Sequence, residues 1–212
     1  MSRVVSYLTT ETINSITHAL GILFGFFFIP SLLAFAFRHG NTAELVGVSV
    51  YGLCYVVTFT FSTLYHATSR EKLKQRFEFF DHISIYFLIA ATYTPFIIQY
   101  MFDSTGILLL LIVWCLVVAG VVFKMYYLNR FILGSVFSYV TMSLLFLVVR
   151  RSFFEKMPDN VIALIYAGIA LYLLGIIFFL WQKLRHHHAL WHLFVLAASI
   201  CHYQAVWLSL KN

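Results

Sequence analysis

The chain has 212 residues, of which 62% are hydrophobic and 10% are charged, and its mean hydropathy is +0.89. This composition excludes most soluble folds, because too little polar chain remains to cover a water-facing surface. The net charge of +6 would suggest nucleic acid as the partner of a soluble protein, but here the basic residues sit in short gaps between apolar runs, where they report topology. We therefore expect an integral membrane protein whose partner is membrane lipid.

Seven apolar runs have the length of about twenty residues that a helix with a rise of 1.5 Å needs to cross a hydrocarbon core of about 30 Å. Most breaks between them are short and contain turn-forming residues. The sequence thus predicts an all-α membrane protein, with one domain over residues 1–212 that forms a seven-transmembrane-helix bundle. The runs cover Ile16–Phe37, Ala43–Tyr65, Ile83–Phe102, Gly106–Tyr126, Phe131–Val149, Val161–Trp181 and Ala189–Leu208.

The connection between the second and third runs is longer than the others. In residues 67–80, charged side chains alternate with Leu73, Phe77, Phe79 and Phe80. This pattern predicts a short amphipathic segment that lies at the membrane interface.

Lysine and arginine residues indicate the orientation, because cytoplasmic loops carry an excess of them. With seven spans, the N-terminus and the second, fourth and sixth gaps share one face, and nine of the fourteen lysine and arginine residues fall there. The opposite face carries the other five. We expect a cytoplasmic N-terminus and a C-terminus outside.

Ionisable residues inside or at the edge of the spans are informative, because each is costly in lipid and tends to face the bundle interior. The second run ends with Ser62 and His66, four residues apart and therefore on one helix face. The third opens at Asp81, and the seventh opens with His188 and His192, again four residues apart. In the expected topology these helix ends all lie on the cytoplasmic side, so the side chains form one polar layer.

The first run contributes to the same layer. Glu11, Asn14 and His18 follow one another at spacings of three and four residues, which places them on one stripe of a helix. This stripe starts at the cytoplasmic end of the first helix.

Each of these residues also has a simpler interpretation. His66 taken alone fits an interfacial or hydrogen-bonded histidine, and Asp81 could be the N-cap of the third helix. Ser62 could donate to the carbonyl oxygen four residues earlier. The spacing of His188 and His192 is common enough to fit ordinary packing as well as a metal site.

Taken together, three imidazoles, one carboxylate and one hydroxyl on three helices match a catalytic zinc site with three protein nitrogens and an open fourth position. Neutral imidazole suits zinc, and nearby carboxylates commonly orient a ligand or the bound water. Zinc is therefore the expected cofactor.

At these same positions the chain resembles the hemolysin III family, the bacterial branch of the progestin and adipoQ receptor superfamily. The matching pieces follow the order of the family along nearly the whole chain. They are Glu11-x-x-Asn14-x-x-x-His18, Ser62-x-x-x-His66, Phe80-Asp81-His82 with Thr92-Tyr93-Thr94-Pro95-Phe96, and His188-Ala189-Leu190-Trp191-His192 with Ser199-Ile200-Cys201-His202.

The resemblance implies seven transmembrane helices with the N-terminus inside, in the plasma membrane, which in a bacterium is the inner membrane. It also implies a zinc ion held by His66, His188 and His192, with Asp81 and Ser62 in contact with the zinc-bound water or its surroundings.

Around these ligands we expect Glu11, Asn14 and His18 to support the site from the first helix. Carboxylate, amide and imidazole groups are the kinds of side chain that orient metal-binding histidines.

Three functions are compatible with these residues. The first is a metal-dependent hydrolase that acts on a membrane lipid amide or ester at the cytoplasmic side, an analogy with the alkaline ceramidases of the wider superfamily. In it, Asp81 would accept or relay a proton and Ser62 would donate to the developing oxyanion.

The second function is that of a lytic or pore-forming hemolysin, although polar residues gathered at one end argue against a constitutive pore. The third is a non-catalytic sensor of membrane lipid state, in which the zinc is structural.

Overall fold

A computed structural model of the chain describes residues 2–128 and 130–211, with side chains from residue 10 onward. The described residues form seven helical spans that are long and apolar enough to cross a membrane, which confirms the expected all-α, seven-helix architecture. The elements are α1 (Ser2–His39), α2 (Thr42–Ala67), α3 (Glu71–Tyr100), α4 (Ser104–Tyr127), α5 (Ile132–Ser143), the 3-10 helix η1 (Leu145–Val149), α6 (Arg150–Phe154), α7 (Asp159–Leu180) and α8 (His187–Ser209).

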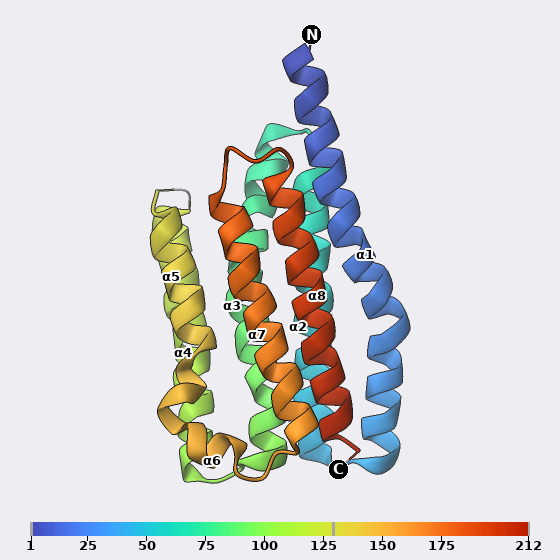
Figure 1. The fold of residues 1–212 in the computed structure, drawn as a ribbon, viewed down its shortest axis with the longest axis vertical. Coiled ribbons are helices and arrows are strands. Elements are labelled where there is room, and N and C mark those ends of the chain that lie inside the picture. Colours follow the sequence, from blue (N-terminus) through green and yellow to red (C-terminus); the bar gives the residue numbers. More distant parts are fainter. Residues whose placement is uncertain (1, 129, 212) are drawn as a thin grey trace.

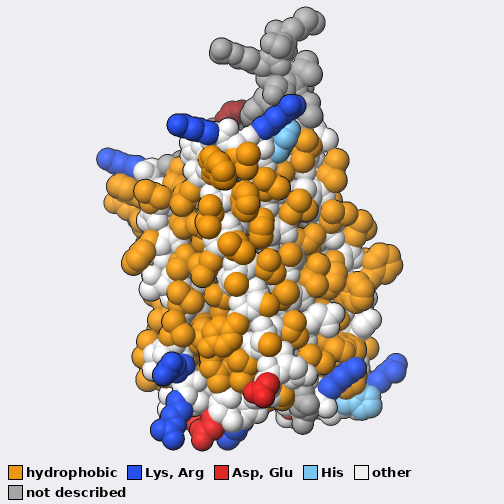
Figure 2. Space-filling view, in the orientation of Figure 1, with side chains coloured by type: hydrophobic (Ala, Val, Ile, Leu, Met, Phe, Trp, Pro, Cys, Tyr) orange, Lys and Arg blue, Asp and Glu red, His pale blue; other side chains and the backbone are white. Residues whose placement is uncertain are grey.

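The helices run up and down through one bundle, in which α5, η1 and α6 together form the fifth span. Helix α8 packs against α7 and α1, and α2 packs between α1 and α3, while α4 and α5 form one edge (Figure 1). Helix α1 begins at one end of the bundle and α8 finishes at the opposite end (Figure 1). Figure 2 shows apolar side chains over the middle of the molecule and lysine and arginine at its two ends. Which end faces the cytoplasm stays a prediction.

Local turn chemistry makes the reversals between neighbouring spans sharp. Asn41 and Glu44 form a reciprocal capping box at the start of α2, in which Asn41 Oδ1 accepts from Glu44 N at 3.0 Å. Asp103 caps α4 by accepting from Gly106 N at 3.0 Å. A Cβ atom at Gly106 would lie 1.7 Å from Met101 O, so this turn requires glycine.

The structure differs from the sequence prediction in residues 67–80. Only residues 68–70 lie outside helices, and the chain from Glu71 onward forms the first turns of α3 rather than a separate interfacial helix. No glycine or proline interrupts the chain between Glu71 and Asp81, so the helix continues from the interface into the span. Asp81 therefore lies well inside α3, which excludes its interpretation as a helix N-cap.

Helix α1 approaches α2 closely at Gly21. A Cβ atom at this position would lie 2.0 Å from the ring of Phe59, which is fully buried. The same ring lies 5.1 Å from the His18 ring, measured between centroids. Small residues allow two membrane helices to pack at short distance, so Gly21 fixes how far His18 reaches into the bundle.

We expect Gly21→Ala to lower the free energy of unfolding by about 1–3 kcal/mol, because the buried Phe59 ring must move to make room. Gly134→Ala is the matched control, since the nearest side-chain atom to its Cβ would be Phe131 Cβ at 3.5 Å, an ordinary van der Waals contact. The comparison uses reversible unfolding of both variants in mixed micelles, and equal stability of the two would contradict the close approach at Gly21.

Candidate metal centre

Three histidines from two helices meet at one end of the bundle. His66 lies in the last turn of α2, and His188 and His192 lie in the first turns of α8. One ring nitrogen of each lies within 4.8 Å of those of the other two. The three residues that the sequence grouped as ligands are therefore brought together by the fold.

The spacing and chemistry of these nitrogens fit a single metal ion. His66 Nε2 and His192 Nε2 are 3.1 Å apart, and two nitrogens bound to one tetrahedral ion at 2.0–2.1 Å are roughly 3.3 Å apart. His66 and His192 are buried, and His188 is half-buried. Imidazole nitrogens suit zinc and also copper, iron and nickel, so the donor set fits a metal without fixing its identity.

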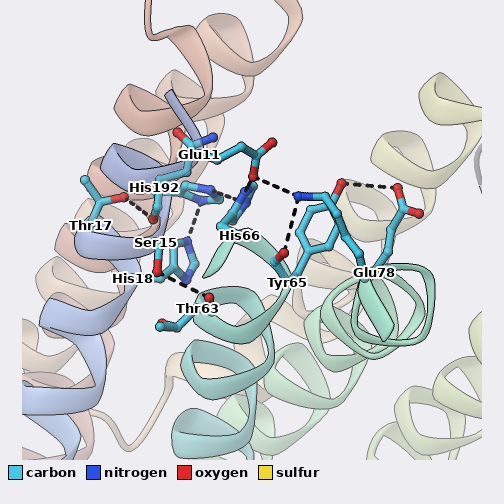
Figure 3. A network of polar contacts seen from close by, with 11 residues as sticks. Glu11, Ser15, Thr17, His18, Thr63, Tyr65, His66, Glu78 and His192 are labelled. Carbon is cyan, nitrogen blue, oxygen red and sulfur yellow. Dashed lines mark hydrogen bonds and ion pairs between the residues drawn. The ribbon is translucent and has the colours of Figure 1, made fainter. Parts of the chain in front are cut away.

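Glu11 contacts the ring nitrogen of His66 that does not face His192 (Figure 3). The distance from His66 Nδ1 to Glu11 Oε2 is 2.8 Å. A carboxylate at this nitrogen favours the tautomer in which Nδ1 carries the proton and Nε2 is free to bind a metal. Lys74 Nζ lies 3.0 Å from the same oxygen of Glu11. The carboxylate is therefore held in place by both His66 of α2 and Lys74 of α3.

His18 supports His192 in a similar way. His18 Nε2 and His192 Nδ1 are hydrogen-bonded (Figure 3). If His192 Nε2 faces the metal, Nδ1 carries the proton and donates it to His18 Nε2, which places the proton of His18 on its own Nδ1. Asn14 is buried and lies one helical turn before His18, on the same face of α1. Glu11 and His18 thus contact His66 and His192 respectively, whereas the supporting role expected of Asn14 stays a prediction.

Asp81 on α3 and Ser62 on α2 line the same cavity as His188 and His192. The Ser62 hydroxyl is buried and lies next to the Asp81 carboxyl group. Within the described part of the chain it has no hydrogen-bond partner of normal geometry, so the expected alternative, a bond to the carbonyl four residues earlier, is not formed. Both groups can therefore turn toward a molecule in the cavity.

The cavity has a volume of about 350 Å³ and extends from the histidines into the bundle between α3, α5, α7 and α8. Its walls are mostly apolar, with side chains such as Leu88, Val136 and Leu173. At its inner part lie Tyr172 and His202. His202 stands apart from the ligand cluster, as its distance of ten residues along the helix from His192 predicts.

Sequence reasoning missed three features of this region. Lys124 is buried near the end of α4 and is the only lysine or arginine among the described residues that line the cavity. Its Nζ donates to Leu128 O at 3.1 Å. Tyr172 OH and Ser199 Oγ are hydrogen-bonded at 2.8 Å deeper in the bundle, and Lys74 pairs with Glu11. Lys124 lies at the end of the fourth apolar run, and this position was the available signal for its burial. Lys74 lies in the charged segment 67–80, where the sequence offers no sign of its pairing with Glu11.

Comparison with known proteins adds an independent line of evidence. A family model described as Haemolysin-III related matches residues 6–203. The chain is 38% identical to Hemolysin-3 of Bacillus cereus over 199 residues, which are 94% of this chain and 91% of that protein. It is 37% identical to the Hemolysin-3 homolog of Bacillus subtilis (strain 168) over 189 residues, 89% of each chain.

A more distant relative comes from animals. The chain is 28% identical to the monocyte to macrophage differentiation factor of Homo sapiens over 203 residues, which are 92% of this chain and 82% of that protein. No solved structure matches the chain.

We expect the purified wild-type protein to hold one metal ion per chain, and His66→Ala, His188→Ala and His192→Ala each to lose it, because two nitrogens do not complete the site. Metal content of detergent-purified protein measures this directly. His187→Ala is the matched control, since His187 neighbours His188 on α8 but is not part of the cluster. Full metal content in all three ligand variants would rule out this centre.

Replacement of Glu11 by glutamine should weaken metal affinity by roughly 10–100-fold, since the neutral amide no longer fixes the His66 tautomer as strongly. The affinity is measured by competition with a chelator of known strength. Glu155→Gln, at an exposed glutamate outside the cluster, should leave it unchanged. Equal affinity of Glu11→Gln and wild type would show that Glu11 does not support the centre.

Proposed function

Because the chain belongs to the haemolysin-III family of integral multi-pass membrane proteins, we propose that it is a zinc-dependent hydrolase of a membrane lipid amide or ester, acting at the cytoplasmic side. The observation that carries the proposal is the position of His188 and His192, which cluster with His66, at the polar end of a largely apolar cavity. Such a cavity suits an acyl chain, while the bond to be cleaved lies among polar groups.

The three histidines would hold the zinc ion through nitrogens that face a common point. A bound zinc ion supplies a Lewis acid that polarises a carbonyl group and makes water a stronger nucleophile at neutral pH. Three protein ligands leave a fourth position for substrate or water, as in catalytic rather than structural zinc sites.

Asp81 and Ser62 carry the remaining chemistry in this proposal. Asp81 lies in the cavity wall, where a carboxylate can accept a proton from water and pass it to the leaving group. Ser62 has a hydroxyl that can turn from Asp81 toward an oxyanion and donate to it. The apolar walls exclude bulk water, which strengthens these polar interactions.

Lysis is the second candidate function, because the two Bacillus relatives are named hemolysins. The hydrogen-bonded Tyr172 and Ser199 place polar atoms deeper in the bundle than the histidine cluster, which a conducting path would need. The apolar wall between these groups and the histidines favours a lipid substrate over a path for ions.

The hydrolase proposal predicts that Asp81→Asn lowers lipid turnover by about 10²–10⁴-fold while metal content stays at the wild-type level, because the variant loses a proton acceptor and keeps the ligands. Asp103→Asn is the matched control, since asparagine is as good an N-cap as aspartate. Turnover is measured as fatty acid released from vesicles that contain the purified protein, with and without chelator.

Three other outcomes separate the alternatives. Release that persists in Asp81→Asn and in chelator eliminates the hydrolase. Escape of an entrapped dye without lipid turnover supports lysis. A sensor with structural zinc retains its function in Asp81→Asn as long as the metal remains bound.

A further inference from the structure

Two separate cavities reach the metal centre from different sides. The apolar cavity touches His188 and His192 but not His66. A second cavity, with a volume of about 430 Å³, reaches His66 instead and lies between α1 and the turn that joins α2 to α3. Most of the residues that line it are polar, and we refer to it as the polar port, lined by Glu11, Thr12, Ser15, Ser69, Glu71 and Lys74.

We propose that the polar port is the route by which a divalent cation passes between the aqueous phase and the metal centre, with Glu11 as its contact at the inner end and Lys74 as the gate. The proposal rests on the metal site of the proposed function and adds to it how the ion enters. A hydrated cation is poorly accommodated by the apolar cavity, because transfer of a charge into an apolar environment is costly. The polar port offers oxygen atoms along the way.

Glu11 occupies the point at which the port meets the centre. Its Oε2 lies 2.8 Å from His66 Nδ1 on one side, and its side chain keeps 18% of its surface exposed on the other. Carboxylate oxygens are accepted ligands of zinc and of other divalent cations. An incoming ion can therefore exchange water for Glu11 before it reaches the imidazole nitrogens.

Lys74 closes this path electrostatically. Its Nζ lies 3.0 Å from Glu11 Oε2 and 3.4 Å from Tyr65 O, and it sits 4.7 Å from the centre of the Tyr65 ring. In this position the ammonium group of Lys74 pairs with the carboxylate of Glu11 and repels an incoming divalent cation. Its side chain is 16% exposed, so the contact can open toward water without unfolding of the bundle.

The gate is tested by metal exchange kinetics rather than by lipid turnover. Wild-type protein in lipid nanodiscs is loaded with Zn²⁺, the ion is removed by excess chelator, and the stripped protein is reloaded with Zn²⁺ alone. We expect Lys74→Met to accelerate both removal and reloading several-fold, because the repulsion at the port is gone. Lys74→Arg should keep the wild-type rates, and Lys72→Met is the matched control on an exposed residue of the same turn.

A second variant tests the route itself. Ser69→Trp places a large side chain in the wall of the port, away from the ligands, and should slow removal and reloading alike without a change in the final metal content. Val140→Trp, in the wall of the apolar cavity, should leave both rates unchanged.

The kinetic results can overturn the proposal in two ways. Unchanged rates in Lys74→Met and Ser69→Trp exclude the port. Faster removal with slower reloading in Lys74→Met shows that Lys74 acts on affinity alone and is no gate. If the wild-type protein binds no metal, the proposed function and this inference are both refuted. If it binds metal but the variants exchange it at the wild-type rates, only the inference is refuted.

Discussion

Polar groups inside a membrane bundle must find their partners within the protein, because lipid offers none. Two of the three histidines meet this constraint through residues of α1. His66 reaches Glu11, and His192 reaches His18, both on α1. The candidate metal centre is thus formed by α2 and α8 but oriented by α1, and the close approach at Gly21 allows α1 to come near enough to do so.

The same arrangement separates two environments at one end of the molecule. One face of the histidine cluster looks into an apolar cavity, and the other looks through Glu11 into a polar one. A lipid and a cation differ most in the free energy of transfer from water to an apolar environment, which is favourable for acyl chains and very unfavourable for charges. This separation fits the two proposals, in which a lipid reaches the histidines through the apolar cavity and a cation reaches them through the polar port.

The sequence alone predicted the features that depend on local spacing. Helical periodicity places Ser62 and His66 on one face and His188 and His192 on another, and the length of the apolar runs determines which helix ends share a layer. Features that depend on tertiary packing were not predictable in this way. Lys74 belongs to a segment expected to form a separate interfacial helix, and its partner Glu11 is 63 residues away. The cavity walls likewise require several helices at known distances.

The two carboxylates of the candidate site lie in different surroundings, which fits the different roles proposed for them. Glu11 is paired with Lys74 and His66 through its Oε2 and stays partly exposed, so its charge is compensated and its carboxylate is engaged with one of the three histidines. Asp81 lies across the cluster in the apolar cavity, beside the hydroxyl of Ser62. A proton acceptor must face the substrate, whereas a group that fixes a ligand tautomer must face the ligand. Asp81 faces the cavity in which a substrate would bind, and Glu11 faces the ligand His66. Each carboxylate therefore meets only one of the two conditions.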